Sequence, residues 1–124
     1  MPGGSDLSIS LHLLRGWLIV PVRVGARYTL EMVLDTGAPL SGISQGTANL
    51  LLPTGFLEPM QRRGNVYLLK QLSIQGQPID DLEVRVLQRL TEVRAPGILG
   101  LDFLGRFEEI HCHVPSLTLT LTDP

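Results

Sequence analysis

Short runs of alternating apolar and polar residues, divided by turn-forming residues, recur along almost the whole chain. Residues 7–14 form the first run, and runs at 17–24 and 27–34 follow with Gly25 near the junction between them. A period of two residues is typical of strands with one buried face, and a glycine between two such runs indicates a hairpin turn. Repeated at spacings of roughly 8 to 12 residues, this pattern predicts an all-β fold, with a closed barrel of short strands as its expected form.

The same pattern returns in the second half of the chain. Alternating runs at 66–74 and 77–87 flank a turn at Gln75-Gly76, and two last runs cover 108–114 and 117–122. Pairs of runs separated by a short turn predict further hairpins.

Two stretches interrupt the strand pattern and predict short helices. Residues 44–52 could form one helix, with Ser44 or Thr47 as its N-cap. A second short helix is expected near the C-terminus over residues 102–107, with Asp102 as its N-cap.

The length of the chain is sufficient for one domain. A chain of 124 residues with 44% hydrophobic composition can bury one core of its own, so residues 7–122 are expected to form a single domain. Residues 1–6 are interpreted as a flexible leader or a remnant of cloning. The most apolar early stretch, residues 11–24, is broken by Arg15 and Pro21 and is too short to span a membrane, so we expect a cytoplasmic protein.

Charge and cysteine content exclude several classes of protein. The net charge of −2, with both signs mixed along the chain, gives no basic stripe for nucleic acid. Cys112 is the only cysteine, so no internal disulfide can form. His111 and His113 fall on one face of a predicted strand, but no third and fourth ligand are evident beside them. We expect neither a metal site nor an organic cofactor.

The segment Asp35-Thr36-Gly37-Ala38 ends the third apolar run. Glycine lets the backbone turn sharply after a strand, and small side chains leave room for a substrate or for a second copy of the same loop. By itself the tripeptide Asp-Thr-Gly could equally mark an ordinary turn aspartate.

A second motif, Gly-Ile-Leu-Gly-Leu-Asp-Phe-Leu, occupies residues 97–104. Together with the first motif it resembles the retropepsin-like, single-lobed aspartic proteases of retroviral type, over residues 7–121. In that family an Asp-Thr-Gly-Ala loop after an apolar strand pairs with a later Ile-Leu-Gly segment that leads into a short helix. The resemblance implies an obligate homodimer without cofactors, in which Asp35 of each chain contributes half of a catalytic dyad. The implied activity is that of an aspartic endopeptidase acting on peptide or protein substrates.

The resemblance also assigns roles to the neighbours of Asp35. Thr36 would hydrogen-bond across the dyad, and Gly37 and Ala38 would offer backbone groups to the bound peptide. Ile98, Leu99 and Gly100 would support the loop from beneath, with Gly100 allowing close backbone approach. Gly64 and Asn65 are the candidate tip of a flap that closes over the substrate.

Two residues next to the catalytic motif refine this prediction. Two-lobed aspartic proteases usually carry a hydroxyl residue where this chain has Ala38, and without that hydrogen-bond donor we expect activity at mildly acidic pH, roughly 4 to 6. Pro39 stands where the family generally has Ser, Thr or Asp. Because proline has no N–H group, one donor to the substrate backbone is missing there.

Other interpretations remain open from the sequence. A non-catalytic module could use the same fold for peptide binding or dimerisation. Asp102 could be a second carboxylate of the active site, although a helix N-cap or an ion pair with Arg106 is the ordinary interpretation of an aspartate at that position.

Overall fold

The computed structural model describes residues 6–61, 64–87 and 95–123. Over these residues the chain is mostly β-structure with short helices. In chain order, the elements are β1 (Asp6–Ser10), β2 (His12–Leu14), β3 (Trp17–Val24), β4 (Tyr28–Leu34), β5 (Gly42–Ser44), α1 (Gln45–Leu51), the 3-10 helix η1 (Leu52–Thr54), β6 (Leu57–Pro59), β7 (Val66–Leu69), β8 (Leu72–Ile74), β9 (Gln77–Ile79), β10 (Leu82–Leu87), β11 (Gly97–Leu99), α2 (Leu101–Leu104), β12 (Glu109–His113) and β13 (Thr118–Thr122).

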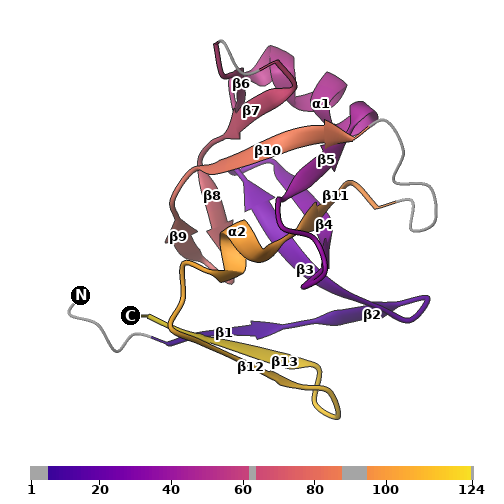
Figure 1. Ribbon diagram of the computed structural model, residues 1–124, viewed down its shortest axis with the longest axis vertical. Helices are drawn as coiled ribbons and strands as arrows, with labels where there is room; N and C mark the ends of the chain where they lie inside the picture. Colours follow the sequence, from indigo (N-terminus) through magenta and orange to yellow (C-terminus); the bar gives the residue numbers. More distant parts are fainter. Residues whose placement is uncertain (1–5, 62–63, 88–94, 124) are drawn as a thin grey trace.

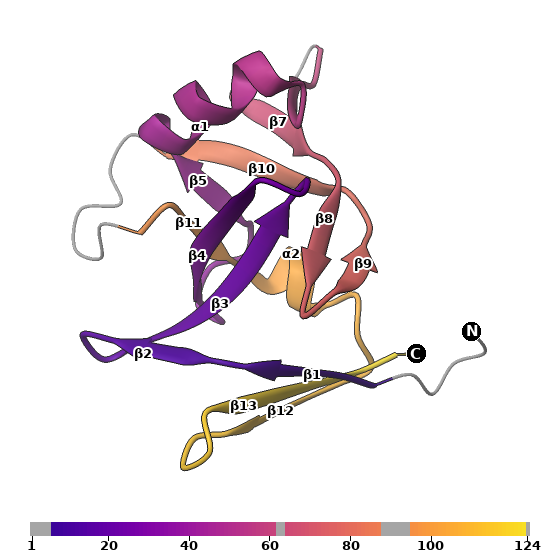
Figure 2. The same ribbon diagram turned by 180° about the vertical axis from the view of Figure 1, so that it is seen from behind.

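The strands form two sheets. The larger, ten-stranded sheet has the order β6-β7-β10-β5-β11-β4-β3-β8-β9, and β2 also pairs with β3. The smaller sheet has the order β1-β13-β12, so the two ends of the described chain lie in the same sheet. In Figures 1 and 2 this three-stranded sheet and α1 lie at opposite ends of the molecule.

The prediction of a closed barrel is wrong, because the larger sheet ends at β6 on one side and at β9 on the other. The run 66–74 does not form one continuous strand, since Gln71 adopts a left-handed conformation with φ +56° between β7 and β8. β7 therefore pairs with β10, whereas β8 pairs with β3 and β9. The terminal strands form their own sheet and do not close the larger one.

The position of β11 determines the geometry of the Asp35 loop. β11 pairs in parallel with β4 and antiparallel with β5, so it lies between the two strands that residues 35–41 connect. A connection between the two neighbours of β11 has to cross the end of β11. The loop that carries Asp35 therefore lies over Gly100, the residue that follows this strand.

The main apolar core lies between the sheets and the helices, and Ile19, Val33 and Ala95 form a second, smaller cluster. Alternate residues of the strands supply most of the main core, and Phe103 and Leu104 of α2 extend it toward the three-stranded sheet. The largest fully buried side chains are Phe103, Ile9, Ile19, Met32, Ile43, Leu51, Leu57, Leu69, Ile74, Leu82, Leu99 and Leu104. Burial of one such side chain contributes about 1.5–3 kcal/mol, and Leu99, Phe103 and Leu104 anchor β11 and α2 in the core.

Several local predictions are confirmed. The run 17–24 is β3 over its whole length, and Gly25, with φ +59°, turns the chain toward β4. Ser44 caps α1, its Oγ accepting a hydrogen bond of 3.1 Å from the N–H of Thr47. The prediction for the second helix is wrong at both ends, because α2 covers only Leu101–Leu104 and its N-cap is Gly100, not Asp102.

The predicted leader, residues 1–6, lies outside the described residues except for Asp6, which begins β1. Among the helices of the described ranges, none has the length and apolar character required to cross a membrane.

Candidate active site

Asp35 follows β4 directly and is half-buried at the start of the loop. Its N–H donates to the carbonyl of Leu99 at 2.9 Å, which continues the pairing of β4 with β11 by one residue. Its Oδ1 accepts the N–H of Gly37 at 3.0 Å, and its carbonyl accepts the N–H of Ala38 at 3.2 Å. Within the described part of the chain Oδ2 has no hydrogen-bond donor, so this oxygen is available to a water molecule or a substrate.

Further backbone hydrogen bonds fasten the loop to the segment after β11. They join Leu101 N to Ala38 O at 2.8 Å and Asp102 N to Pro39 O at 3.2 Å. The structure thus brings the predicted residues 35–38 together with the predicted support residues 98–100. Thr36 and Gly37 are exposed, as a surface that meets another molecule requires.

Gly100 is the point of closest approach between these segments. A Cβ atom on Gly100 would lie 2.6 Å from the carbonyl oxygen of Ala38 and 2.9 Å from that of Leu40. Gly97 is similarly enclosed, because its Cβ would lie 2.6 Å from the carbonyl oxygen of Gly42. The two glycines of the second motif are therefore needed for space, which is what the sequence predicted for Gly100.

Ser41, which is 1% exposed, was not predicted from the sequence to belong to the site. Its Oγ donates to Asp102 Oδ1 at 2.6 Å and accepts the N–H of Gly100 at 3.0 Å. Its N–H lies 3.0 Å from both carboxylate oxygens of Asp102, and its carbonyl accepts the N–H of Arg85 at 3.2 Å. In the sequence, Ser41 is recognisable only as a serine directly before a buried strand. That position does not predict which residue its hydroxyl group binds.

Asp102 therefore lies against the back of the loop, in the first turn of α2. Besides Ser41 it accepts the N–H of Phe103 at 2.8 Å. The expected ion pair with Arg106 does not form within the described residues, because the guanidinium donates to the carbonyls of Asp80 at 3.0 Å and Asp81 at 2.6 Å. Asp102 therefore supports the loop from behind. Within the described residues, no hydrogen bond joins its carboxylate to that of Asp35.

The exposed rim of the loop is apolar. Leu40 is 43% exposed and Leu101 is 48% exposed, and Pro39 between Ala38 and Leu40 is exposed as well. Leu40 also lines a small cavity of about 30 Å³ together with Val66 of β7. Two larger cavities, of about 340 and 210 Å³, are lined by residues near the chain ends, β9 and α2 and include no residue of the Asp35 loop.

The candidate flap residues lie in the connection of the β6–β7 hairpin. Gly64 is exposed with φ +56°, and Asn65 is held against β10, since its Nδ2 donates to the carbonyl of Val86 at 2.6 Å. Gly64 therefore turns the chain, and Asn65 fastens the end of the turn to β10. That this hairpin closes over a substrate remains a prediction.

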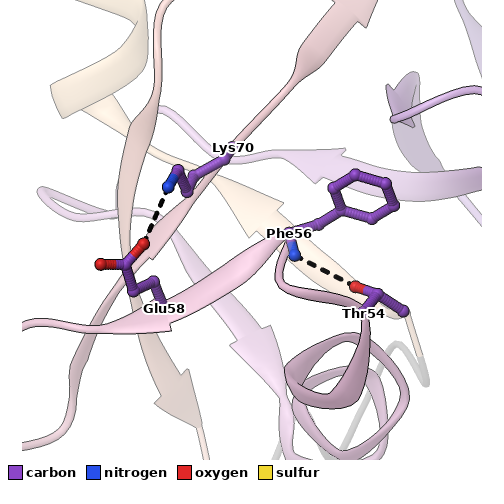
Figure 3. A network of polar contacts seen from close by, with 4 residues as sticks. All are labelled: Thr54, Phe56, Glu58 and Lys70. Carbon is purple, nitrogen blue, oxygen red and sulfur yellow. Dashed lines mark hydrogen bonds and ion pairs between the residues drawn. The ribbon is translucent and has the colours of Figure 1, made fainter.

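The base of the same hairpin is tied by two polar contacts (Figure 3). Thr54 Oγ1 accepts the N–H of Phe56 at 3.1 Å, and Lys70 Nζ lies 2.8 Å from Glu58 Oε2 across the hairpin. The hydrogen bond that Lys70 donates to Glu58, together with the negative charge of Glu58, raises the pKa of Lys70. These contacts fix where the hairpin leaves the body of the protein.

The described residues contain no group of three or more His, Cys, Asp or Glu side chains placed to hold a metal ion. His113 Nδ1 and Ser116 Oγ share a hydrogen bond of 2.7 Å.

Comparison with known proteins identifies the fold. The sequence matches no family model and no curated protein. A retropepsin-like aspartic protease from Rickettsia conorii superposes with a TM-score of 0.65 at 18% identity, over 99% of this chain and 96% of that chain. The retroviral protease-like domain of Ddi1 from Leishmania major superposes with a TM-score of 0.60 at 16% identity, over 87% of this chain and 92% of that chain. This protein has the retropepsin-like fold.

Proposed function

We propose that the protein is an aspartic endopeptidase in which Asp35 from each of two identical chains forms the catalytic dyad. The observation that carries the proposal is the position of Asp35, half-buried with one free carboxylate oxygen on a loop that is fastened across the end of β11. The retropepsin-like fold supports it, because the two superposed structures are a protease and a protease-like domain. One such loop supplies one carboxylate, so a complete site requires a second chain related by a two-fold axis.

The chemistry follows from two carboxylates that face one another. Two such groups a few Å apart do not both ionise readily, so they share one proton and hold a water molecule between them. The ionised carboxylate accepts a proton as the water oxygen attacks the scissile carbonyl carbon, while the protonated one donates to the carbonyl oxygen. The tetrahedral intermediate then collapses, its C–N bond breaks, and the leaving amine takes up a proton from the dyad. No metal or organic cofactor takes part in these steps.

The substrate is proposed to be an extended polypeptide lying between the two Asp35 loops and the two β6–β7 hairpins. Exposed backbone at Thr36 and Gly37 can hydrogen-bond to such a chain, whereas Pro39 can offer only its carbonyl, which already accepts the N–H of Asp102. The exposed side chains of Leu40 and Leu101 favour apolar substrate residues near this position.

The test compares the wild type with Asp35→Asn, and with Asp81→Asn as a control that removes an exposed carboxylate elsewhere. Each protein is incubated with a mixed peptide library between pH 4 and 6, with and without pepstatin, and products are identified by mass spectrometry. We expect cleavage by the wild type and by Asp81→Asn and none by Asp35→Asn. Cleavage that persists unchanged in Asp35→Asn rules out the dyad.

A second measurement tests the shared site. Sedimentation near pH 5 should find a dimer under the conditions in which peptides are cleaved, and a strict monomer that still cleaves peptides would contradict the proposal. The rival function is a non-catalytic peptide-binding or dimerisation module. It is favoured if the wild type forms a dimer and binds peptides without cleaving any of them.

A further inference from the structure

We infer that Ser41 and Asp102 are positioning residues for Asp35, so that their hydrogen bonds determine how closely the two carboxylates of the dyad approach one another. This inference rests on the proposed function, because it concerns the same site. Neither residue was identified as part of the catalytic machinery from the sequence.

Hydrogen bonds hold the buried Ser41 on all sides. Every polar group of this buried residue has a partner, since its N–H and Oγ bind Asp102, its Oγ accepts from Gly100 and its carbonyl accepts from Arg85. Hydrogen bonds to an ionised carboxylate are roughly twice as strong as neutral ones, and burial strengthens them further. A residue held in this way cannot shift without leaving several buried groups unpaired.

Asp35 and Ser41 lie at the two ends of the loop that joins β4 to β5. The loop is anchored at its start by the bond from Asp35 N to Leu99 O, and at its end by Ser41. Between these anchors, and within the described residues, Ala38 and Pro39 bind the segment after β11 through their carbonyl groups. The Ser41 side chain adds two bonds to that segment, one to Asp102, 61 residues away in the chain, and one from the N–H of Gly100.

In a dyad on a two-fold axis, the position of each loop sets the distance between the two carboxylates. A displacement of one loop is repeated in its partner, so a small shift of Asp35 changes the distance between the carboxylates twice over. Two carboxylates that move apart repel each other less, so the acid and alkaline limbs of the pH–rate profile approach one another. Misplacement of a reacting group by about 1 Å can lower the rate about 100-fold.

The test uses Ser41→Ala, Asp102→Asn, the double variant and Ser41→Thr, which keeps a hydroxyl group. Ser73→Ala and Asp81→Asn are the matched controls, because neither side chain makes a hydrogen bond within the described residues. For each protein, kcat and KM are measured from pH 3 to 8 with a peptide that the wild type cleaves. The rates are expressed per dimer, with the dimer concentration measured by sedimentation in the same buffer, so that partial unfolding or dissociation does not count as slow catalysis.

We expect Ser41→Ala to lower kcat per dimer about 10- to 100-fold, to change KM about threefold or less, and to narrow the pH–rate profile. Asp102→Asn should act in the same direction, and the double variant should lose less than the product of the two single effects, because both substitutions alter the hydrogen bond from Ser41 Oγ to Asp102. Ser41→Thr should restore the width of the profile.

The opposite results overturn the inference. If Ser41→Ala and Asp102→Asn melt at lower temperature but match the two controls in kcat per dimer and in profile width, the pair is only structural. If their effects multiply in the double variant, the two residues act independently. An active wild type with either result leaves the proposed protease function standing, whereas a wild type that cleaves no peptide removes the proposed function and this inference with it.

Discussion

Gly100 lies so close to Ala38 that a Cβ atom on the glycine would be 2.6 Å from the carbonyl oxygen of the alanine. The atoms that such a Cβ would meet are backbone atoms of the Asp35 loop, including the carbonyl carbon and oxygen of Leu40 at 2.9 Å. A flexible side chain could turn aside from this contact, but the backbone of a loop anchored at both ends cannot. A larger residue in place of Gly100 would therefore have to displace the Asp35 loop.

Gly100→Ala is expected to displace the loop and to lower stability by roughly 1–3 kcal/mol, as overpacking of a dense interior does. Cleavage should fall by more than the loss of folded protein explains, because the displaced segment carries Asp35. Urea unfolding and kcat measured on the same samples separate the two effects.

Gly46→Ala is the control, since its Cβ would meet only Ser44 Oγ at 3.9 Å. Because Gly46 lies in an exposed turn of α1, alanine there should stabilise the protein by up to about 1 kcal/mol. Equal loss of activity in Gly100→Ala and Gly46→Ala would contradict this displacement of the Asp35 loop.

The Lys70–Glu58 contact at the base of the β6–β7 hairpin predicts a pH dependence. The pKa of Lys70 is raised above its ordinary value of 10.5, first by the hydrogen bond that Lys70 donates to Glu58 and then by the charge of that carboxylate. A raised pKa in the folded state means that this contact stabilises the protein below about pH 10 for as long as Glu58 is ionised, and that the effect is lost as the pH rises through the pKa of Lys70.

In Glu58→Gln the pKa of Lys70, measured by NMR titration of its side chain, should fall toward 10.5. Asp81→Asn should lower it much less, because Asp81 is the smallest of the contributing charges. Added salt should reduce the difference between the wild type and Glu58→Gln. An unchanged pKa in Glu58→Gln would show that the contact does not persist in solution.

Local features of the fold were predictable because their causes are local. The alternation of β3, the turn at Gly25 and the cap of α1 by Ser44 each depend on residues within a few positions of one another. The position of residues 98–100 beneath the Asp35 loop was implied only by the resemblance, since periodicity does not join the two motifs. The pairing of β4 with β11 was not predicted.

Features that depend on distant residues were not predictable. Gln71 takes a left-handed conformation without being glycine, so no turn signal announced the break that directs β7 and β8 to different partners. The contact between Ser41 and Asp102 spans 61 residues and requires the loop to cross β11 first. From the sequence, Asp102 was interpreted by its position near a helix start, which is the local rule that tertiary pairing overrides here.

The shared site predicts how an inactive subunit affects an active one. If each site needs Asp35 from both chains, an equimolar mixture of wild type and Asp35→Asn, dissociated and reassembled, contains about a quarter wild-type homodimers. Activity should therefore be about a quarter of that of the same total concentration of wild type, and about half if each chain acted alone. Asp81→Asn mixed in the same way should leave full activity. Subunit exchange is verified by native mass spectrometry, and half activity after complete exchange would refute the shared site.

Ala38 predicts the direction in which the pH dependence can be moved. The N–H of Ala38 donates to the backbone carbonyl of Asp35 at 3.2 Å, so the two residues belong to the same tight turn. A hydroxyl group there could donate to the ionised carboxylate and keep it ionised at lower pH. A net hydrogen bond to a charged group contributes about 1.5 kcal/mol, which corresponds to about one pH unit. In Ala38→Ser the acid limb of the pH–rate profile should move down by up to about one unit, while kcat at the optimum changes little.

Ala38→Thr and Ala38→Val provide a pair of nearly equal shape, of which only threonine carries a hydroxyl. The prediction is contradicted if valine moves the acid limb as far as threonine does, because the shift would then come from side-chain volume and not from a hydrogen bond.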